Sequence, residues 1–179
     1  MNKRFQYLNT LLWIVILMIP FLLQTAGIID TNQYKITKDN GWTSIFTGPF
    51  LHASYSHVMG NATSILLGTS LISVFYKRMY FPVVILGFLV PSVTMYLLGM
   101  KAVGISGLCY CLIWFIILRG LMSKNKWRFP LSCIILIFYG SSLHTIYPPS
   151  NPFSLVAWEA HLSGLLTGLV LAIYSKIRE

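Results

Sequence analysis

The chain has 179 residues, of which 56% are hydrophobic and 9% are charged, and its formal net charge is +9. A soluble domain carries about a quarter charged residues, so this composition excludes a soluble globular protein and predicts an integral membrane protein. The charge does not indicate nucleic-acid binding, because the basic residues cluster at the ends of apolar segments, where they orient helices.

Six apolar segments follow one another along the chain, and a span takes roughly 20 residues. We therefore predict an all-α fold: a polytopic transmembrane helix bundle with six spans, forming a single domain over residues 1–179 with no internal repeat. The predicted spans are residues 11–29, 52–76, 80–98, 106–118, 129–146 and 157–174.

The longest polar stretch is a loop over residues 30–51, between the first two spans. It places Trp42, Phe46 and Phe50 at the i, i+4, i+8 spacing of one helical face. If the segment is helical, this aromatic face favours the membrane interface, and Pro49 interrupts the helix near its end.

The basic residues are divided unequally between the two sides of the predicted bundle. Three of them, Lys35, Lys38 and Lys101, lie on the side of the long loop. Because positive residues are enriched in cytoplasmic loops, we expect both termini in the cytoplasm and the long loop outside. The ten residues on the cytoplasmic side are Lys3, Arg4, Lys77, Arg78, Arg119, Lys124, Lys126, Arg128, Lys176 and Arg178.

Two polar residues inside apolar spans are the main functional signal. Ser106 follows Gly104 and precedes Gly107, and His161 lies in the last span. Polar groups at membrane depth are costly and are functional-site candidates by default. A hydroxyl and an imidazole that meet form a nucleophile and its base, so the pair predicts a membrane enzyme.

The predicted topology brings further polar residues to the same depth. The second, fourth and sixth spans all begin outside, so His57, Asn61, Ser106 and His161 lie in the outer part of the bilayer. His57 and Asn61 share a helical face at i, i+4 spacing, as do Ser106 and Tyr110. The common depth predicts one shared site.

The last span carries a stripe of small residues, Ala160, Gly164 and Gly168, which allows a close approach of another helix. No carboxylate is placed to orient His161, because Glu159 points to a different helical face. Of the other acidic residues, Asp30 and Asp39 lie in the outer loop and Glu179 at the far end. The pattern favours a Ser-His dyad over a triad.

The remaining histidines and the cysteines suggest structural roles. His52 is expected to brace the outer end of the second span, and His144 to lie at the membrane interface. We predict no metal site and no cofactor. The three cysteines fall in apolar segments and are expected to be small core residues, without a disulfide or a zinc site: Cys109, Cys111 and Cys133.

Three blocks of this sequence resemble the rhomboid family of intramembrane serine proteases. The first is a His-x4-His-x3-Asn block formed by His52, His57 and Asn61. The second is a GxSG motif around Ser106, and the third an AHxxGxxxG block that begins at Ala160. Their order and separation also resemble the family, and the resemblance covers the chain as a minimal six-helix core of the bacterial type.

The resemblance implies a role for each matching residue. Ser106 would be the nucleophile and His161 the general base, with Tyr110 packed against the imidazole. His57, Asn61 and the backbone N–H of Ser106 would form the oxyanion hole. The supporting glycines would be Gly104, Gly107, Gly164 and Gly168. The family often has a Trp-Arg pair in its first outer loop, whereas Trp42 is followed here by Thr43, which leaves the packing of that loop open.

This interpretation implies a serine-type endopeptidase that cleaves transmembrane segments of other proteins near the outer face. Its partners would be transmembrane protein substrates and the lipid bilayer, without nucleic acid, in a bacterial cell membrane. One alternative is a rhomboid-like pseudoenzyme that binds membrane proteins without cutting them. A small transporter is disfavoured, because transporters tend to have internal repeats and a midplane site.

Overall fold

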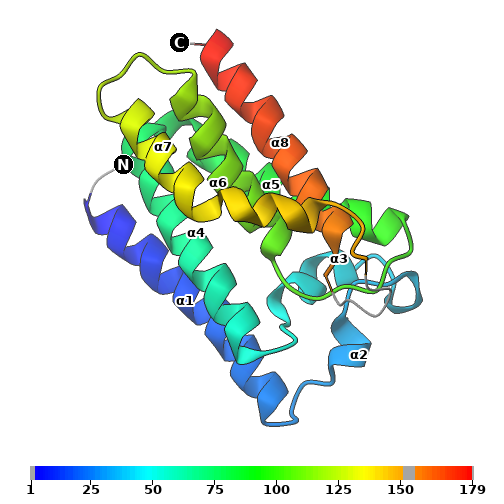
Figure 1. Ribbon diagram of the computed structural model, residues 1–179. Helices are drawn as coiled ribbons and strands as arrows, with labels where there is room; N and C mark the ends of the chain where they lie inside the picture. Colours follow the sequence, from blue (N-terminus) through cyan, green and yellow to red (C-terminus); the bar gives the residue numbers. More distant parts are fainter. Residues whose placement is uncertain (1–2, 151–155, 179) are drawn as a thin grey trace.

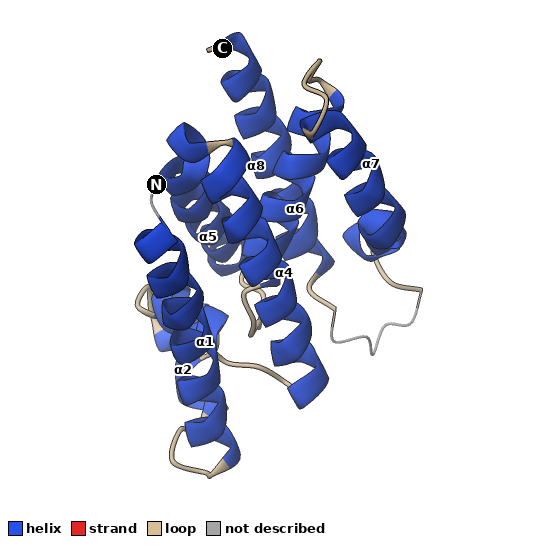
Figure 2. Ribbon diagram, turned by 90° about the vertical axis from the view of Figure 1, so that its left-hand side faces the viewer, coloured by secondary structure: helices blue, strands red, loops and turns tan. Residues whose placement is uncertain are grey.

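The computed structural model describes residues 3–150 and 156–178, so Glu179 lies outside the described residues. The described chain is helical and holds no strand, as Figure 2 shows. The predicted all-α membrane bundle is therefore confirmed. Its elements are α1 (Lys3–Thr25), α2 (Thr31–Tyr34), η1 (Lys38–Asn40), α3 (Ser44–Thr47), η2 (Gly48–Phe50), α4 (Tyr55–Phe75), η3 (Lys77–Met79), α5 (Tyr80–Leu97), α6 (Ser106–Leu121), α7 (Arg128–Tyr139), η4 (Gly140–Ile146) and α8 (Trp158–Ile177).

In the described part of the chain, four helical stretches are long and apolar enough to cross a membrane, so length alone does not establish the six predicted spans. The four are Tyr55–Phe75, Lys77–Leu97, Arg128–Ile146 and Trp158–Ile177. Two further apolar stretches are shorter, Leu11–Thr25 and Ser106–Leu121. Large apolar side chains on the outside of the bundle, such as Phe138 at 75% and Val170 at 64% exposure, form the surface that lipid covers.

Helix α6 is the centre of the bundle and packs against α4, α5, α7 and α8 (Figure 1). Its residues are apolar on all sides, which is the pattern of a helix that is buried all round, and Phe115 and Ile117 have no exposed surface. With 16 residues it is about 24 Å long, shorter than the ~30 Å hydrocarbon core. Its first residue, Ser106, is half-buried.

The small-residue stripe of α8 packs directly on α6. A Cβ added to Gly164 would collide with the carbonyl oxygen of Gly107 and lie 3.1 Å from Tyr110 Cβ. A Cβ on Gly168 would lie 2.7 Å from the carbonyl oxygen of Cys111. Both glycines therefore face α6, and the absence of side chains sets how closely the two backbones approach.

The loop that leads into Ser106 is attached to the outer loop by main-chain hydrogen bonds. Ile36 and Ala102 form an antiparallel bridge, with N···O distances of 2.8 and 3.1 Å. The Gly104 N–H donates to the carbonyl oxygen of Gly48 at 3.2 Å. These bonds pair backbone groups that lie inside the protein, where an unpaired group is costly.

The outer loop does not contain one aromatic helix. It forms α3 and, directly after it, the 3-10 helix η2, which contains Pro49. The change of helix type at Gly48 separates the rings. Trp42 and Phe46 remain exposed and meet edge to face at 6.2 Å. Phe50 instead stacks on Phe88 of α5 at 5.7 Å. Packing of Phe50 against the bundle outweighs the shared helical face expected from spacing.

The start of α1, the end of α8 and the connection between α6 and α7 lie at one end of the bundle, and α2 and α3 lie at the other (Figures 1 and 2). We predict from the sequence that the first span starts, and the last span ends, on the side opposite the long outer loop, and the helices run in these directions. The placement of Ser106 and His161 near the end that carries α2 and α3 follows from the same directions, since α6 and α8 both begin there.

The contact between α6 and α8 generates the first prediction. Gly164→Val would force a branched side chain against the backbone of Gly107, and overpacking of this kind costs about 1–3 kcal/mol. Gly60→Val is the matched control, because a Cβ there meets nothing within 4 Å. We expect a lower melting temperature in detergent for Gly164→Val than for Gly60→Val. Equal melting temperatures would show that the close helix contact is not required.

Candidate active site

Ser106 and His161 meet at the start of α6 and α8. Ser106 is the first residue of α6, and His161 lies in the first turn of α8. Their side chains are in hydrogen-bond contact, with Oγ and Nε2 2.9 Å apart. A nucleophile and its base need this reach of about 2.6–3.2 Å, so the pair can transfer a proton.

The protonation of His161 follows from the partners of its other ring nitrogen. Nδ1 lies 3.1 Å from the carbonyl oxygen of Thr145 and 3.1 Å from Thr145 Oγ1. A carbonyl oxygen only accepts, so in the neutral ring Nδ1 carries the proton and Nε2 is an acceptor. The Ser106 hydroxyl therefore donates to Nε2, which is the direction that activates a serine.

Tyr110 supports the imidazole from one face. The rings of Tyr110 and His161 are stacked, with centroids 4.3 Å apart and planes 8° apart. The Tyr110 hydroxyl donates to the carbonyl oxygen of Ser142 at 2.9 Å and is also in contact with Thr145 Oγ1. The hydroxyl is held by these two contacts, and the stacked phenol ring limits rotation of the histidine ring.

Several hydrogen-bond donors lie close to the loop before Ser106. Gly104 has φ +99°, a conformation that only glycine adopts readily, and a Cβ there would lie 2.8 Å from His57 Nε2 and 3.6 Å from Asn61 Nδ2. The His57 and Asn61 side chains therefore lie against this backbone. The first N–H groups of a helix have no intrahelical partner, so the start of α6 offers donors at the same place.

Both the nitrogen and the oxygen of the Asn61 side-chain amide make hydrogen bonds. Its Nδ2 donates to Nε2 of His52 at 3.0 Å, and the Cys109 thiol donates to its Oδ1 at 3.5 Å. His52 Nδ1 in turn donates to the carbonyl oxygen of Phe50 at 3.2 Å. Gln24 of α1 bonds both backbone groups of His52, at 3.1 and 2.7 Å. This network fixes the direction of the remaining Asn61 N–H.

His52 is fully buried, and its environment keeps it neutral. Burial, reinforced by the nearby His57, lowers the pKa of His52 to about 4. A neutral imidazole with its proton on Nδ1 leaves Nε2 free to accept from Asn61. The expected bracing role of His52 thus has a specific target, the amide of Asn61.

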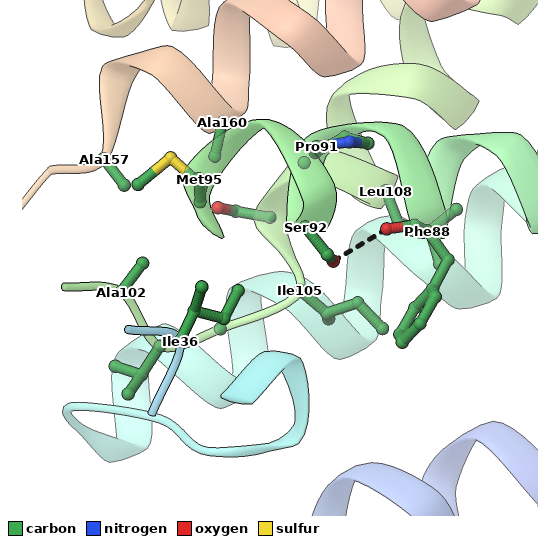
Figure 3. Close-up of a pocket in the computed structure, with 14 residues that line it drawn as sticks. Ile36, Phe88, Pro91, Ser92, Met95, Ala102, Ile105, Leu108, Ala157 and Ala160 are labelled. Atoms are coloured by element: carbon green, nitrogen blue, oxygen red, sulfur yellow. Dashed lines mark hydrogen bonds between the residues drawn. The ribbon is translucent and has the colours of Figure 1, made fainter. Parts of the chain in front are cut away.

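A cavity of about 850 Å³ opens beside these residues and is lined by Ser106, His161, His57, Asn61 and Tyr110. Gly60 and Ser64 continue its wall along α4. A second, much smaller recess of about 20 Å³ also touches Ser106. Figure 3 shows this recess among Met95, Pro91 and Ile105, with the Ser92 hydroxyl turned away to donate to the Phe88 carbonyl.

The other polar residues considered in the sequence analysis make no hydrogen bond or ion pair with the Ser-His pair in the described part of the chain. Among the described residues, no hydrogen bond or ion pair joins Glu159 to His161, and His144 is exposed and contacts the Ser141 carbonyl. No group of three or more His, Cys, Asp or Glu that could hold a metal occurs in the described part of the chain. The three cysteines are free thiols.

Sequence reasoning missed Thr145 and Cys109 as parts of the site. Thr145 lies in η4, after α7, and no motif distinguishes it from other polar residues of that segment. Cys109 was expected to be a core residue, and it is buried, but its thiol also contacts Asn61. Only the folding of distant segments together reveals either contact.

The buried contact between His52 and Asn61 generates the second prediction. His52→Leu removes the acceptor for Asn61 Nδ2, and an unsatisfied buried donor costs about 1–3 kcal/mol. His52→Gln keeps an acceptor oxygen near the position of Nε2. We expect His52→Leu to melt at a clearly lower temperature than His52→Gln in the same detergent. If the two variants melt together, the hydrogen bond does not contribute to stability.

Comparisons with known proteins agree with this geometry. The chain is 26% identical over 153 residues to an uncharacterized protein of Mycobacterium tuberculosis and, with the same figures, to one of Mycobacterium bovis; the match covers 80% of this chain and 63% of each relative. An uncharacterized protein of Mycobacterium leprae is 25% identical over 156 residues, 83% of this chain and 62% of the relative. The chain thus spans less than two thirds of these relatives. Residues 39–177 match the Rhomboid domain, and the protein belongs to the rhomboid family.

Proposed function

We propose that this protein is an intramembrane serine endopeptidase that uses Ser106 and His161 to cleave transmembrane segments of other membrane proteins. Membership of the rhomboid family, whose members are generally intramembrane serine proteases, supports an enzyme of this class. The observation that carries the proposal is the 2.9 Å contact between Ser106 Oγ and His161 Nε2 at the edge of an 850 Å³ cavity.

The reaction begins with proton transfer from Ser106 to Nε2 of His161. Oγ attacks the carbonyl carbon of the scissile peptide bond and forms a tetrahedral intermediate, and the imidazolium then gives its proton to the leaving amine. Water attacks the acyl-enzyme ester in the second half, with His161 again taking the proton. The cavity gives space for both the extended substrate chain and the water.

The oxyanion of each intermediate is stabilised by donors fixed before the substrate arrives. In this proposal they are the side chains of His57 and Asn61 and the backbone N–H of Ser106. The Ser106 N–H lies at the positive end of the α6 dipole. Such preorganised donors act strongly in a site that excludes bulk water. The hydrogen bonds that hold the Asn61 amide support this role.

The proposed substrates are transmembrane helices that unwind near the outer boundary of the bilayer. Ser106 lies at the end of the bundle that carries α2 and α3, and the charge bias of the sequence assigns the opposite end to the cytoplasm. Cleavage would therefore occur towards the outer face, with both termini of the enzyme in the cytoplasm of a bacterial cell. The contact between Ser106 and His161 disfavours a pseudoenzyme that only binds membrane proteins.

The nucleophile and the base generate the third prediction. We expect Ser106→Ala and His161→Ala to lower cleavage of a fluorescent transmembrane peptide by at least about 10³-fold. A fluorophosphonate probe should label only chains that retain Ser106. Glu159→Gln serves as the control and should keep most activity, because no contact joins Glu159 to the imidazole. Persistent labelling of Ser106→Ala would show that Ser106 is not the nucleophile. A loss of activity in Glu159→Gln as large as that in His161→Ala would contradict the dyad.

The oxyanion donors generate the fourth prediction. Loss of one such donor lowers kcat by about 10²–10³-fold, so we expect this loss for Asn61→Ala with a much smaller change in KM. Thr63→Ala is a suitable control on the same helix, since Thr63 is exposed, its hydroxyl donates to the Met59 carbonyl at 2.9 Å, and it does not line the cavity. Steady-state kinetics on one peptide substrate decides the point. An unchanged kcat for Asn61→Ala would exclude that side chain from the oxyanion hole.

A further inference from the structure

We propose that the side chain of Thr145 is a positioning residue of the catalytic base, and that it supplies the orientation which a carboxylate supplies in a Ser-His-Asp triad. This inference rests on the proposed function. It concerns a residue outside the three sequence blocks, on the segment that follows α7. The argument depends on which atoms around His161 can accept a hydrogen bond.

The single proton of the Thr145 hydroxyl is already committed. Oγ1 donates to the carbonyl oxygen of Ser142, 2.9 Å away, within the turn of η4. Oγ1 can therefore only accept from His161 Nδ1 at 3.1 Å, as does the Thr145 carbonyl oxygen at the same distance. Both acceptors belong to one residue, and both favour the ring form with the proton on Nδ1.

The hydroxyl also joins the two groups that hold the imidazole. Tyr110 supports the face of the ring, and its hydroxyl contacts Thr145 Oγ1. Thr145 supports the edge of the ring through Nδ1. A ring fixed at its face and at one edge has its Nε2 lone pair directed at Ser106 Oγ, which is what the proton transfer needs.

A neutral orienting group suits this location. In a protease triad the aspartate fixes the tautomer and the direction of the imidazole, and the wrong tautomer alone lowers kcat by about 10⁴-fold. A carboxylate at membrane depth carries a large desolvation cost. A hydroxyl and a carbonyl oxygen fix the same tautomer without a buried charge. Because Thr145 belongs to η4 and not to α8, the alignment of the base depends on where η4 is held.

The test compares Thr145→Val, which is nearly isosteric and lacks Oγ1, with Thr145→Ser, which keeps the hydroxyl. Thr167→Val is the matched control, because Thr167 on α8 also donates to a helix carbonyl, that of Ser163 at 2.7 Å, and does not line the cavity. Two measurements are made on the full chain in detergent. One is kcat and KM on a transmembrane peptide, and the other is the ¹⁵N NMR shifts of the His161 ring nitrogens, identified by their loss in His161→Ala.

We expect Thr145→Val to lower kcat about tenfold, the effect of roughly one neutral hydrogen bond, with KM changed less than about twofold. The ¹⁵N shifts should show a smaller share of the form with the proton on Nδ1. Thr145→Ser should restore both quantities to near the wild-type values, and Thr167→Val should change neither.

Two results would overturn the inference. One is a Thr145→Val chain with wild-type kcat and wild-type ring shifts. The other is a loss of kcat that Thr145→Ser does not restore and that leaves the ring shifts unchanged, which would indicate a structural role only. Failure of the proposed function is distinguishable, because it would appear as a wild-type chain that cleaves no peptide, whereas the ring shifts test Thr145 without any turnover.

Discussion

The close contact between α6 and α8 is the constraint on which the site depends. Gly164 and Gly168 have no side chains, so the two backbones approach until Gly164 meets the Gly107 carbonyl. Helices in a membrane associate through such packing, since lipid tails are as apolar as the side chains. The same contact sets the distance from Ser106 to His161, because both lie within one turn of it. Packing and reactivity are therefore determined by the same few atoms.

A short α6 creates a second requirement. The helix begins at the half-buried Ser106, and the loop just before it carries half-buried backbone groups that need hydrogen-bond partners. The bridge between Ile36 and Ala102 and the bond from Gly104 to Gly48 meet this need. The outer loop thus acts on the site through the backbone that presents Ser106. Thr43, which replaces the arginine common in the family, is not part of these bonds.

The candidate site is built almost entirely from neutral groups. Thr145 accepts from His161, a neutral His52 accepts from Asn61, and the Cys109 thiol donates to the same amide. In a medium of low dielectric a full charge is costly, whereas a satisfied network of dipoles is not. This explains why the acidic residues of the described chain take no part, and why orientation is distributed over several helices and loops.

Composition and pattern were enough to predict the membrane class, the helical fold, the start of α6 at Ser106 and a shared site, because apolar length and helical periodicity are local properties. The four residues of that site, His57, Asn61, Ser106 and His161, line one cavity. Tertiary packing alone sets the contacts of Thr145, His52 and Cys109 and the short helical segments of the outer loop. It also buries Arg119, which flanks a span in sequence but donates to Ser175 inside the bundle. These contacts join residues that are 9 positions apart for His52 and Asn61, and 56 positions apart for Arg119 and Ser175. No local pattern encodes them, because packing of whole helices selects the partners.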